Sequence, residues 1–289
     1  MRVLFATDGS SDATTASEWV PHLPLPGGAE LLVLTVIEPP VLPRLPGELH
    51  AERRAEAQRL VDETAARLGQ GRQASGRVAE GDPREQIMAV ARSWHAELIV
   101  LGARGVSGIQ RFLLGSVSLG VAREASCSVL VCKGVPRAVR TITVGLDASS
   151  QARDALRWLG ALPRPAGSRI RLVGVAEPQR YPSSAPGILG GTLRAAVAAS
   201  EAEHLAALER TLMGAAKDLP SDGIEISALT GTPPDVLVRE ADRHESDLIV
   251  VGARGAGVVT RVLLGSVSEA VLAHASCPVA VVRARPPGD

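Results

Sequence analysis

The chain has 289 residues, of which 45% are hydrophobic and 21% charged, as in ordinary globular proteins, and it is long enough for two domains with separate cores. Lys plus Arg and Asp plus Glu both number 31, and this zero net charge argues against a nucleic-acid-binding protein, which usually carries a basic excess. Aromatic residues make up only 2% of the chain, which leaves no stacking platform for bases or sugars.

Membrane and export signals are missing from the sequence pattern. No run of about 18 apolar residues occurs, so we expect no membrane-spanning helix. The apolar run at the N-terminus is too short for a signal peptide and leads directly into a strand. The cysteines Cys127, Cys132 and Cys277 lack metal-site spacing, so we expect reduced packing residues and a cytoplasmic location.

Short apolar runs alternate with helix-like stretches along the whole chain. Nearly continuous apolar strands indicate a parallel sheet that is covered on both faces. In the first half we predict strands at 2–8, 30–37, 75–80, 97–102 and 128–133, and helices at 11–22, 48–69, 83–95 and 116–126. In the second half we predict strands at 141–147, 169–176, 224–230, 247–252 and 278–283, and helices at 149–161, 190–218, 233–245 and 266–275.

The two halves are copies of one unit. Residues 98–132 match residues 248–282 at 20 of 35 positions, and the second copy carries extra residues that we place between Gly187 and Asp218. The boundary falls near Gly134–Arg137, which predicts domains at 1–137 and 138–289. Five strands alternating with four helices predict, in each copy, a doubly wound α/β fold with right-handed crossovers.

A glycine motif follows the fourth strand of each copy. Its pattern is Gly-x-x-Gly, nine residues, then Gly-Ser, and a helix begins at the serine. Glycines allow a ligand to approach the backbone, and the free N–H groups and dipole of a helix N-terminus favour phosphate. The sequence therefore predicts two anion sites, formed by Gly102, Gly105, Gly115 and Ser116 in the first copy and by Gly252, Gly255, Gly265 and Ser266 in the second.

An aspartate ends the first strand of each copy, at Asp8 and Asp147. Ligands of open parallel sheets bind beyond the carboxyl ends of the strands, where the strand order reverses. If strands one and four are neighbours, the aspartate and the glycine motif flank one crevice. Such a pair suits a nucleotide, because the loop would hold phosphates and the carboxylate would accept a hydrogen bond from ribose or adenine.

Together, Asp8-Gly9-Ser10, Asp147-Ala148-Ser149 and the two glycine motifs resemble the universal stress protein family in a tandem two-domain form. The resemblance covers nearly all of both halves and implies a Rossmann-like sheet in strand order 3-2-1-4-5. Family members with the full motif generally bind ATP, so it also implies two ATP sites, with Mg²⁺ or Mn²⁺ bound through the phosphates. The one departure, Ala148 in place of Gly9, falls at a turn position that we expect not to require glycine.

The resemblance also assigns residues that the spacing alone does not. Val36 and Val175, on the second strands, would meet adenine through their backbone, and Ser118 and Ser268 would lie beside the phosphates. It further implies that the last strands, Ser128–Lys133 and Pro278–Arg283, pair with each other as an intrachain pseudo-dimer. Whole chains could dimerise further, because an apolar edge strand favours a cover.

Other recurring residues have simpler explanations. Arg104, Arg111, Arg254 and Arg261 could reach phosphate or lie on the surface. Ser116 and Ser266 are expected to cap their helices, and Trp19 and Trp158 to pack in the core. His95 and His244 suit helix C-termini rather than catalysis.

Enzyme signatures are absent from the sequence. It contains neither a G-x-x-x-x-G-K-[ST] loop nor a G-x-G-x-x-G motif after the first strand, and no nucleophile–His–acid order recurs in both halves. The sequence thus favours an ATP-binding sensor or regulator in stress adaptation, with no catalytic residues and no metal held by the protein itself. The alternatives are a slow ATPase or phosphotransfer protein, and a dimeric scaffold that binds no nucleotide.

Overall fold

The computed structural model describes residues 1–39, 47–105, 114–147, 149–178, 188–217, 219, 223–254 and 264–284. The first copy contains β1 (Arg2–Ala6), α1 (Ser11–Trp19), β2 (Glu30–Ile37), α2 (Gly47–Leu68), β3 (Ala74–Glu80), α3 (Pro83–Ser93), β4 (Leu98–Gly102), α4 (Ser116–Glu124) and β5 (Ser128–Cys132). The second contains β6 (Thr141–Gly145), α5 (Ser150–Gly160), β7 (Arg169–Ala176), α6 (Ile188–Ala216), β8 (Ile224–Thr230), α7 (Pro233–Arg243), β9 (Leu248–Gly252), α8 (Ser266–His274) and β10 (Val279–Val282).

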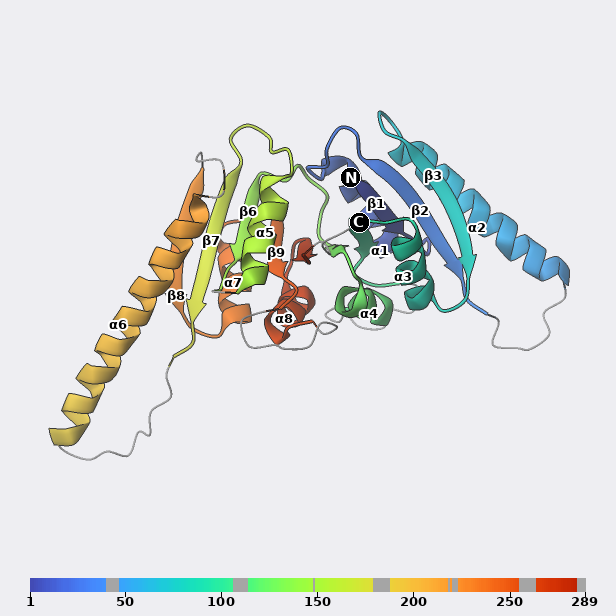
Figure 1. Ribbon diagram of the computed structural model, residues 1–289. Coiled ribbons are helices and arrows are strands. Elements are labelled where there is room, and N and C mark those ends of the chain that lie inside the picture. Colours follow the sequence, from blue (N-terminus) through green and yellow to red (C-terminus); the bar gives the residue numbers. More distant parts are fainter. Residues whose placement is uncertain are drawn as a thin grey trace.

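All ten strands form one sheet, in the order β3-β2-β1-β4-β5-β10-β9-β6-β7-β8. Each copy therefore has the predicted 3-2-1-4-5 order, and its strands pair in parallel. The copies join where β5 pairs antiparallel with β10, with Val129 opposite Val281 and Val131 opposite Val279. The predicted pairing of the two last strands is confirmed, and the palindromic order reflects a pseudo-twofold relation between the copies (Figure 1).

Helices cover both faces of the sheet, as expected for apolar strands. One continuous core contains side chains of α1, α2, α5 and α6, such as Trp19, Val61, Leu156 and Leu212. The other contains side chains of α3, α4, α7 and α8, such as Val121. Each core includes residues of both copies, so the ten-stranded sheet is one packed body.

The predicted elements agree with the structure apart from their ends. The first helix was expected to run to residue 22, but α1 ends at Trp19 and the chain continues as a 3₁₀ turn over Val20–His22, where Pro21 lacks an N–H group. The extra length of the second copy is seen in α6, which has 29 residues where α2 has 22. Trp19 is buried as predicted, and its indole N–H donates to the Lys133 carbonyl at 3.1 Å, whereas Trp158 is only half-buried.

The residue that follows the last strand of each copy reaches across to the other copy. The Lys133 ammonium donates to the Leu272 carbonyl in the last turn of α8 at 2.5 Å. In the same way, the Arg283 guanidinium donates to the Ala122 and Arg123 carbonyls at the end of α4, at 2.7 and 2.8 Å. Cations at helix C-termini are stabilised by the free carbonyls and the helix dipole. Each copy thus caps the last helix of the other.

The cysteines behave as packing residues. Cys127, Cys132 and Cys277 form no disulfide, and Cys277 and Cys132 are buried. Burial raises the pKa of the Cys127 thiol to about 11 and that of Cys277 to about 12, which keeps both thiols protonated and unreactive at neutral pH.

Burial of Lys133 predicts a pH-dependent stability. Desolvation lowers its pKa from 10.5 to about 8, so between these values the unfolded chain binds more protons than the folded one. The contribution of Lys133 to the free energy of unfolding should therefore rise with pH across this window, by up to about 3 kcal/mol at about 1.4 kcal/mol per pKa unit. The raised pKa values of the cysteine thiols act in the opposite direction above pH 9, so the quantity to compare is the difference between two proteins. In urea denaturation, the free energy of unfolding of the wild type should rise between pH 8 and 10.5 relative to that of Lys133→Met.

The control is Lys217→Met, because Lys217 is the second lysine of the chain and is exposed. This variant should keep the pH dependence of the wild type. Equal pH dependence in the two variants would contradict the prediction.

Candidate functional site

The glycine that ends β4 makes close contact with α1. A Cβ atom on Gly102 would lie 2.7 Å from the carbonyl group of Asp12 in the first turn of that helix. The counterpart Gly252 is similarly close to α5, with 3.1 Å from its ideal Cβ to the Cβ of Gln151. Close packing of a helix on the strand thus favours glycine at the end of the fourth strand, most strongly at Gly102.

The N-termini of α4 and α8 have the same local geometry. Gly115 and Gly265 are the N-cap residues, both extended, and each donates its N–H at 2.8 Å to the carbonyl that follows the strand glycine, that of Ala103 or Ala253. Because the cap residues are glycines, no side chain of the described residues caps either helix. The first N–H groups of both helices are therefore available to an anion.

The serines of the glycine motif take different places from those predicted. Ser116 and Ser266 are the first helical residues, not the N-caps, and both are exposed. Close packing favours glycine at the first of these caps, because an ideal Cβ on Gly115 would lie 3.2 Å from the Ala103 carbonyl oxygen and from Arg104 Cα. An exposed hydroxyl at the first helical position can still bind a phosphate oxygen.

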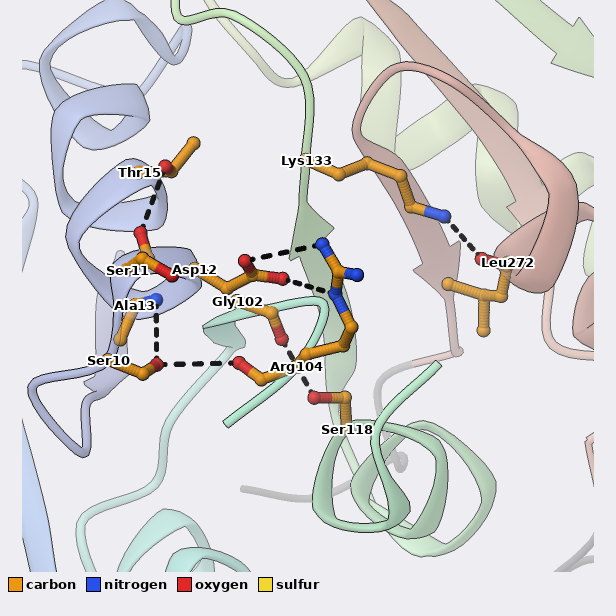
Figure 2. Close-up of polar contacts among 10 residues, drawn as sticks. All are labelled: Ser10, Ser11, Asp12, Ala13, Thr15, Gly102, Arg104, Ser118, Lys133 and Leu272. Atoms are coloured by element: carbon orange, nitrogen blue, oxygen red, sulfur yellow. Dashed lines mark hydrogen bonds and ion pairs between the residues drawn. The ribbon is translucent and has the colours of Figure 1, made fainter. Parts of the chain in front are cut away.

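Ser118 and Ser268, which were expected beside the phosphates, are buried. Their hydroxyls donate to the Gly102 and Gly252 carbonyls at 2.7 and 2.6 Å. In this position they fix the helix N-terminus to the end of the fourth strand. Figure 2 shows this bond for Ser118.

The strand-one aspartate lies against the glycine loop, as the crevice hypothesis predicts. Asp8 accepts a hydrogen bond from the Ser10 N–H at 3.0 Å, and Asp147 accepts the equivalent bond from Ser149. A Cβ atom on Gly105 would lie only 2.6 Å from Asp8 Oδ2. Asp8 and the start of the glycine loop therefore lie together at the carboxyl ends of β1 and β4, which pair in parallel.

Glycine is favoured at two loop positions for different reasons. Gly9 has a φ of 75°, in the left-handed region, so the expectation that this turn does not require glycine is wrong for the first copy. Its counterpart Ala148 lies outside the described residues, as do Gly255, Arg111 and Arg261. Gly105 is not in a positive-φ conformation; a side chain there would require the Asp8 carboxylate to move.

In the second copy, four of the predicted site residues line one cavity of about 140 Å³. They are Asp147, Val175, Gly252 and Ser268, and Arg254 lines it with them. Val175 reaches it from β7, and Val36 holds the equivalent place on β2, where it is half-buried. The cavity is smaller than the roughly 300–1,000 Å³ of most ligand pockets, so its volume is too small for a whole nucleotide.

An aspartate that the sequence analysis did not select holds the loop arginine of the first copy. Arg104 Nε lies 2.9 Å from Asp12 Oδ2, and both side chains are half-buried. Figure 2 shows Arg104 directed toward Asp12 on α1. The residues are 92 apart in sequence, and only the repeat pattern, which places Gln151 opposite Asp12, could have drawn attention to this position.

The two histidines are not equivalent. The C-cap of α3 is Trp94, and the positive-φ residue after it is His95. In the second copy the histidine is the C-cap itself, His244 at the end of α7, and the positive-φ residue is Glu245.

In the described parts of the chain, no group of three or more His, Cys, Asp or Glu side chains could hold a metal ion. No helix there is long and apolar enough to span a membrane.

Comparison with known proteins shows which family the chain belongs to. The model of the universal stress protein family matches residues 1–133 and 138–283. The chain belongs to this family. A universal stress protein of Mycobacterium tuberculosis is 31% identical over 194 residues, so the match spans 65% of this chain and 62% of that relative, less than two thirds of its length.

Other relatives match from end to end. A universal stress protein of Mycolicibacterium smegmatis is 27% identical across 98% of this chain and 97% of its own length. A crystal structure of a universal stress protein from Archaeoglobus fulgidus superposes with a TM-score of 0.67 at 24% identity, over 98% of this chain and 96% of that one. The tandem architecture is therefore shared with other members.

The buried position of Ser118 predicts a structural role. Ser118→Ala removes the donor to the Gly102 carbonyl and should lower the free energy of unfolding by about 1 kcal/mol. Ser116→Ala, at the exposed neighbouring site, should leave it unchanged within about 0.5 kcal/mol. Denaturant titration of both variants checks this, and equal destabilisation by the two would contradict the assignment.

Proposed function

We propose that this universal stress protein binds ATP at one site in each copy and acts as a regulator in stress adaptation. One observation supports the proposal: a helix N-terminus with a glycine cap, the start of a glycine loop and a strand-end carboxylate lie together in the first copy, where an ideal Cβ on Gly105 would be 2.6 Å from Asp8 Oδ2, and Asp147, Gly252 and Ser268 line one cavity in the second. These groups match the parts of a nucleotide. Helix N–H groups suit phosphates, and a carboxylate suits the hydroxyls of a ribose.

In this proposal the first N–H groups of α4 and α8 and the hydroxyls of Ser116 and Ser266 bind phosphate oxygens. Asp8 and Asp147 accept from the nucleoside, and the backbone of Val36 and Val175 meets adenine. Mg²⁺ or Mn²⁺ would be bound through the phosphates, since the protein supplies no cluster of metal ligands in its described part. The cation would neutralise phosphate charge.

Binding of ATP would change the surface through which the protein contacts other proteins. The two copies already pair as a pseudo-dimer through β5 and β10, so further association would involve whole chains. We place the protein in the cytoplasm, where ATP is present and its three unbridged thiols stay reduced.

Stoichiometry tests the proposal. Both copies keep the complete motif, so calorimetric titration should give two ATP molecules per chain. Nucleotide carried through purification should appear after denaturation. If no binding is measured and no nucleotide is released, the scaffold alternative is correct.

The glycine loop gives a sharper test. Valine at position 105 would collide with the Asp8 carboxylate and fill the space beside the phosphates. The double variant Gly105→Val with Gly255→Val should lose ATP binding, weakening it more than about 100-fold, which is about 2.7 kcal/mol. It should keep the far-ultraviolet circular dichroism of the wild type.

The control for this test is Gly27→Val, because Gly27 lies in a loop far from the crevice where an added Cβ meets nothing within 4 Å. This variant should bind ATP normally. Normal ATP binding by the double variant would show that the loop only connects strand to helix.

Slow turnover separates a regulator from an ATPase. Hydrolysis needs a positioned water and usually a base beside the γ-phosphate. The groups assigned to the phosphate end are serines and arginines, and an arginine stays protonated, whereas Asp8 and Asp147 belong to the nucleoside end. Turnover should therefore fall far below the roughly 1–10³ s⁻¹ of typical enzymes.

The measurement is ADP formation during incubation with ATP and Mg²⁺. Turnover near one per second that disappears in Ser116→Ala with Ser266→Ala would favour the slow-ATPase alternative instead.

A further inference from the structure

A cavity of about 670 Å³ lies between the two copies, and its volume falls within the roughly 300–1,000 Å³ of ligand pockets. The first copy lines it with Met1, the end of α3 and the residues at the amino ends of β4 and β5. The second copy lines it with α5 and the residues that follow β10. The cavity shares no lining residue with the one beside Asp147, so it is separate from the candidate nucleotide site.

On the other side of the pseudo-twofold axis, the linker between the copies occupies the equivalent place. Arg137 of the linker donates to the Asp247 carboxylate and, at 3.0 Å, to the Glu245 carbonyl. The linker also passes close to Ser276, since an ideal Cβ on Gly134 would lie 2.7 Å from the Ser276 carbonyl oxygen. Three residues of the second copy thus contact the linker.

The counterparts of these three residues in the first copy line the cavity. By the repeat, Asp247, Glu245 and Ser276 correspond to Glu97, His95 and Ser126, all of which are lining residues. The cavity is therefore the pseudo-symmetric equivalent of the groove that the linker follows. One connection between two copies can follow only one of the two grooves.

The tryptophans show the same difference between the two sides. The indole N–H of Trp19 donates to the carbonyl of Lys133, at the start of the linker. Its counterpart Trp158 lines the cavity, and its buried indole nitrogen has no hydrogen-bond partner in the described part of the chain. The same is true of Nε of Arg283, another lining residue. Buried donors normally have an acceptor, which a ligand oxygen could provide here.

The charges of the lining are mainly positive. Of its two carboxylates, Glu97 lies 3.6 Å from the Met1 ammonium and Asp154 lies 3.1 Å from Arg157, so both are paired with lining cations. Two further lining arginines, Arg92 and Arg283, form no ion pair within the described residues. His95 adds a positive charge when it is protonated. The lining therefore favours an anion.

Arg283 gives this preference a physical basis. Burial and the nearby Arg254 lower the pKa of its guanidinium, which shows a cation that is partly desolvated and near a like charge. Its Nη2 donates to two carbonyls at the end of α4, which fixes its position. An anion beside this fixed cation would be stabilised more than one beside a mobile surface arginine.

We propose that this cavity is a binding site for a small molecule that combines an apolar body with one acidic group. The body would pack against Trp158 and the apolar part of the lining, and the acidic group would lie near Arg92 and Arg283. Because both copies supply the walls, the ligand would bridge them. The proposal goes beyond nucleotide binding and does not depend on it.

Calorimetric titration with a matched pair of probes tests the preference. The probe is 2-naphthoate, and its uncharged control is 2-naphthamide. We expect one 2-naphthoate per chain, and at least about tenfold weaker binding of the amide, because it lacks the charge. Absence of 2-naphthoate binding, or equal affinity for the two probes, would overturn the proposal.

Arginine variants locate the acidic group. Arg92→Gln with Arg157→Gln removes two lining charges and should weaken 2-naphthoate about tenfold, with little effect on the amide. The matched control is Arg84→Gln with Arg153→Gln, which removes two charges from α3 and α5 outside the lining. The control should change the affinity less than about twofold. An equal loss in both double variants would show that net charge alone explains the effect.

Tryptophan variants locate the apolar body. Trp158→Ala should weaken both probes about tenfold, because it removes one wall of the cavity, whereas Trp158→Phe should stay within about threefold of the wild type. The far-ultraviolet circular dichroism of both variants should match that of the wild type. Unchanged affinity in a folded Trp158→Ala would contradict the assignment of the site.

Two further titrations exclude other occupants. Saturating ATP should not displace 2-naphthoate, and displacement would place the probe in the nucleotide crevice instead. A chain that lacks residues 285–289, which follow the lining residue Ala284, should bind 2-naphthoate with the affinity of the full chain, within about twofold. More than about tenfold tighter binding by the shortened chain would show that this segment competes for the cavity, and it would overturn the assignment to a small molecule.

Discussion

The antiparallel pairing of β5 with β10 is the constraint on which the rest of the structure depends. In each copy the strand next to β4 or β9 would be an apolar edge, and such an edge invites association with other chains. Here each copy covers the other. On each face of the sheet, the cluster of buried residues then contains side chains of both copies. The two copies therefore share their cores.

This pairing also explains why the residues after β5 and β10 are cations. Since Val131 lies opposite Val279, the carboxyl end of β5 comes beside the amino end of β10, where the last helix of the other copy ends. Free carbonyls collect at that helix end, and Lys133 or Arg283 satisfies them. The ion pair between Arg123 and Glu269, at 2.6 Å, joins α4 to α8 across the same seam.

Sequence patterns predicted the fold well because the signals were local and repeated. Continuous apolar runs marked buried strands, and duplication of the glycine motif showed where each strand met its helix. Details that depend on distant residues escaped prediction. The ion pair of Asp12 with Arg104 joins residues 92 apart, and the bond of Ser118 to the Gly102 carbonyl joins residues 16 apart. The cap assigned to Ser116 was wrong by one residue, since the backbone angles that distinguish cap from helix are not visible in the sequence.

For the candidate site, the sequence predicted which residues lie near one another but not which contacts each of them makes. Asp8 and Gly105 were expected in one crevice, and the structure places them in contact. Gly102 was expected to serve a ligand, yet its hydrogen atom faces the backbone of α1. A glycine required for packing and one required for binding have the same signature in a sequence. Only coordinates distinguish them.

The helix α8 has only nine residues, so its two ends are separated by about 14 Å. Its N-terminus is the candidate anion site of the second copy, and a carbonyl of its last turn, that of Leu272, holds the ammonium group of Lys133 from the first copy. An anion at one end and a charged ammonium at the other would attract each other, and by thermodynamic linkage each would favour the other. Phosphate arriving in one half of the molecule would then draw a proton onto a lysine of the other half.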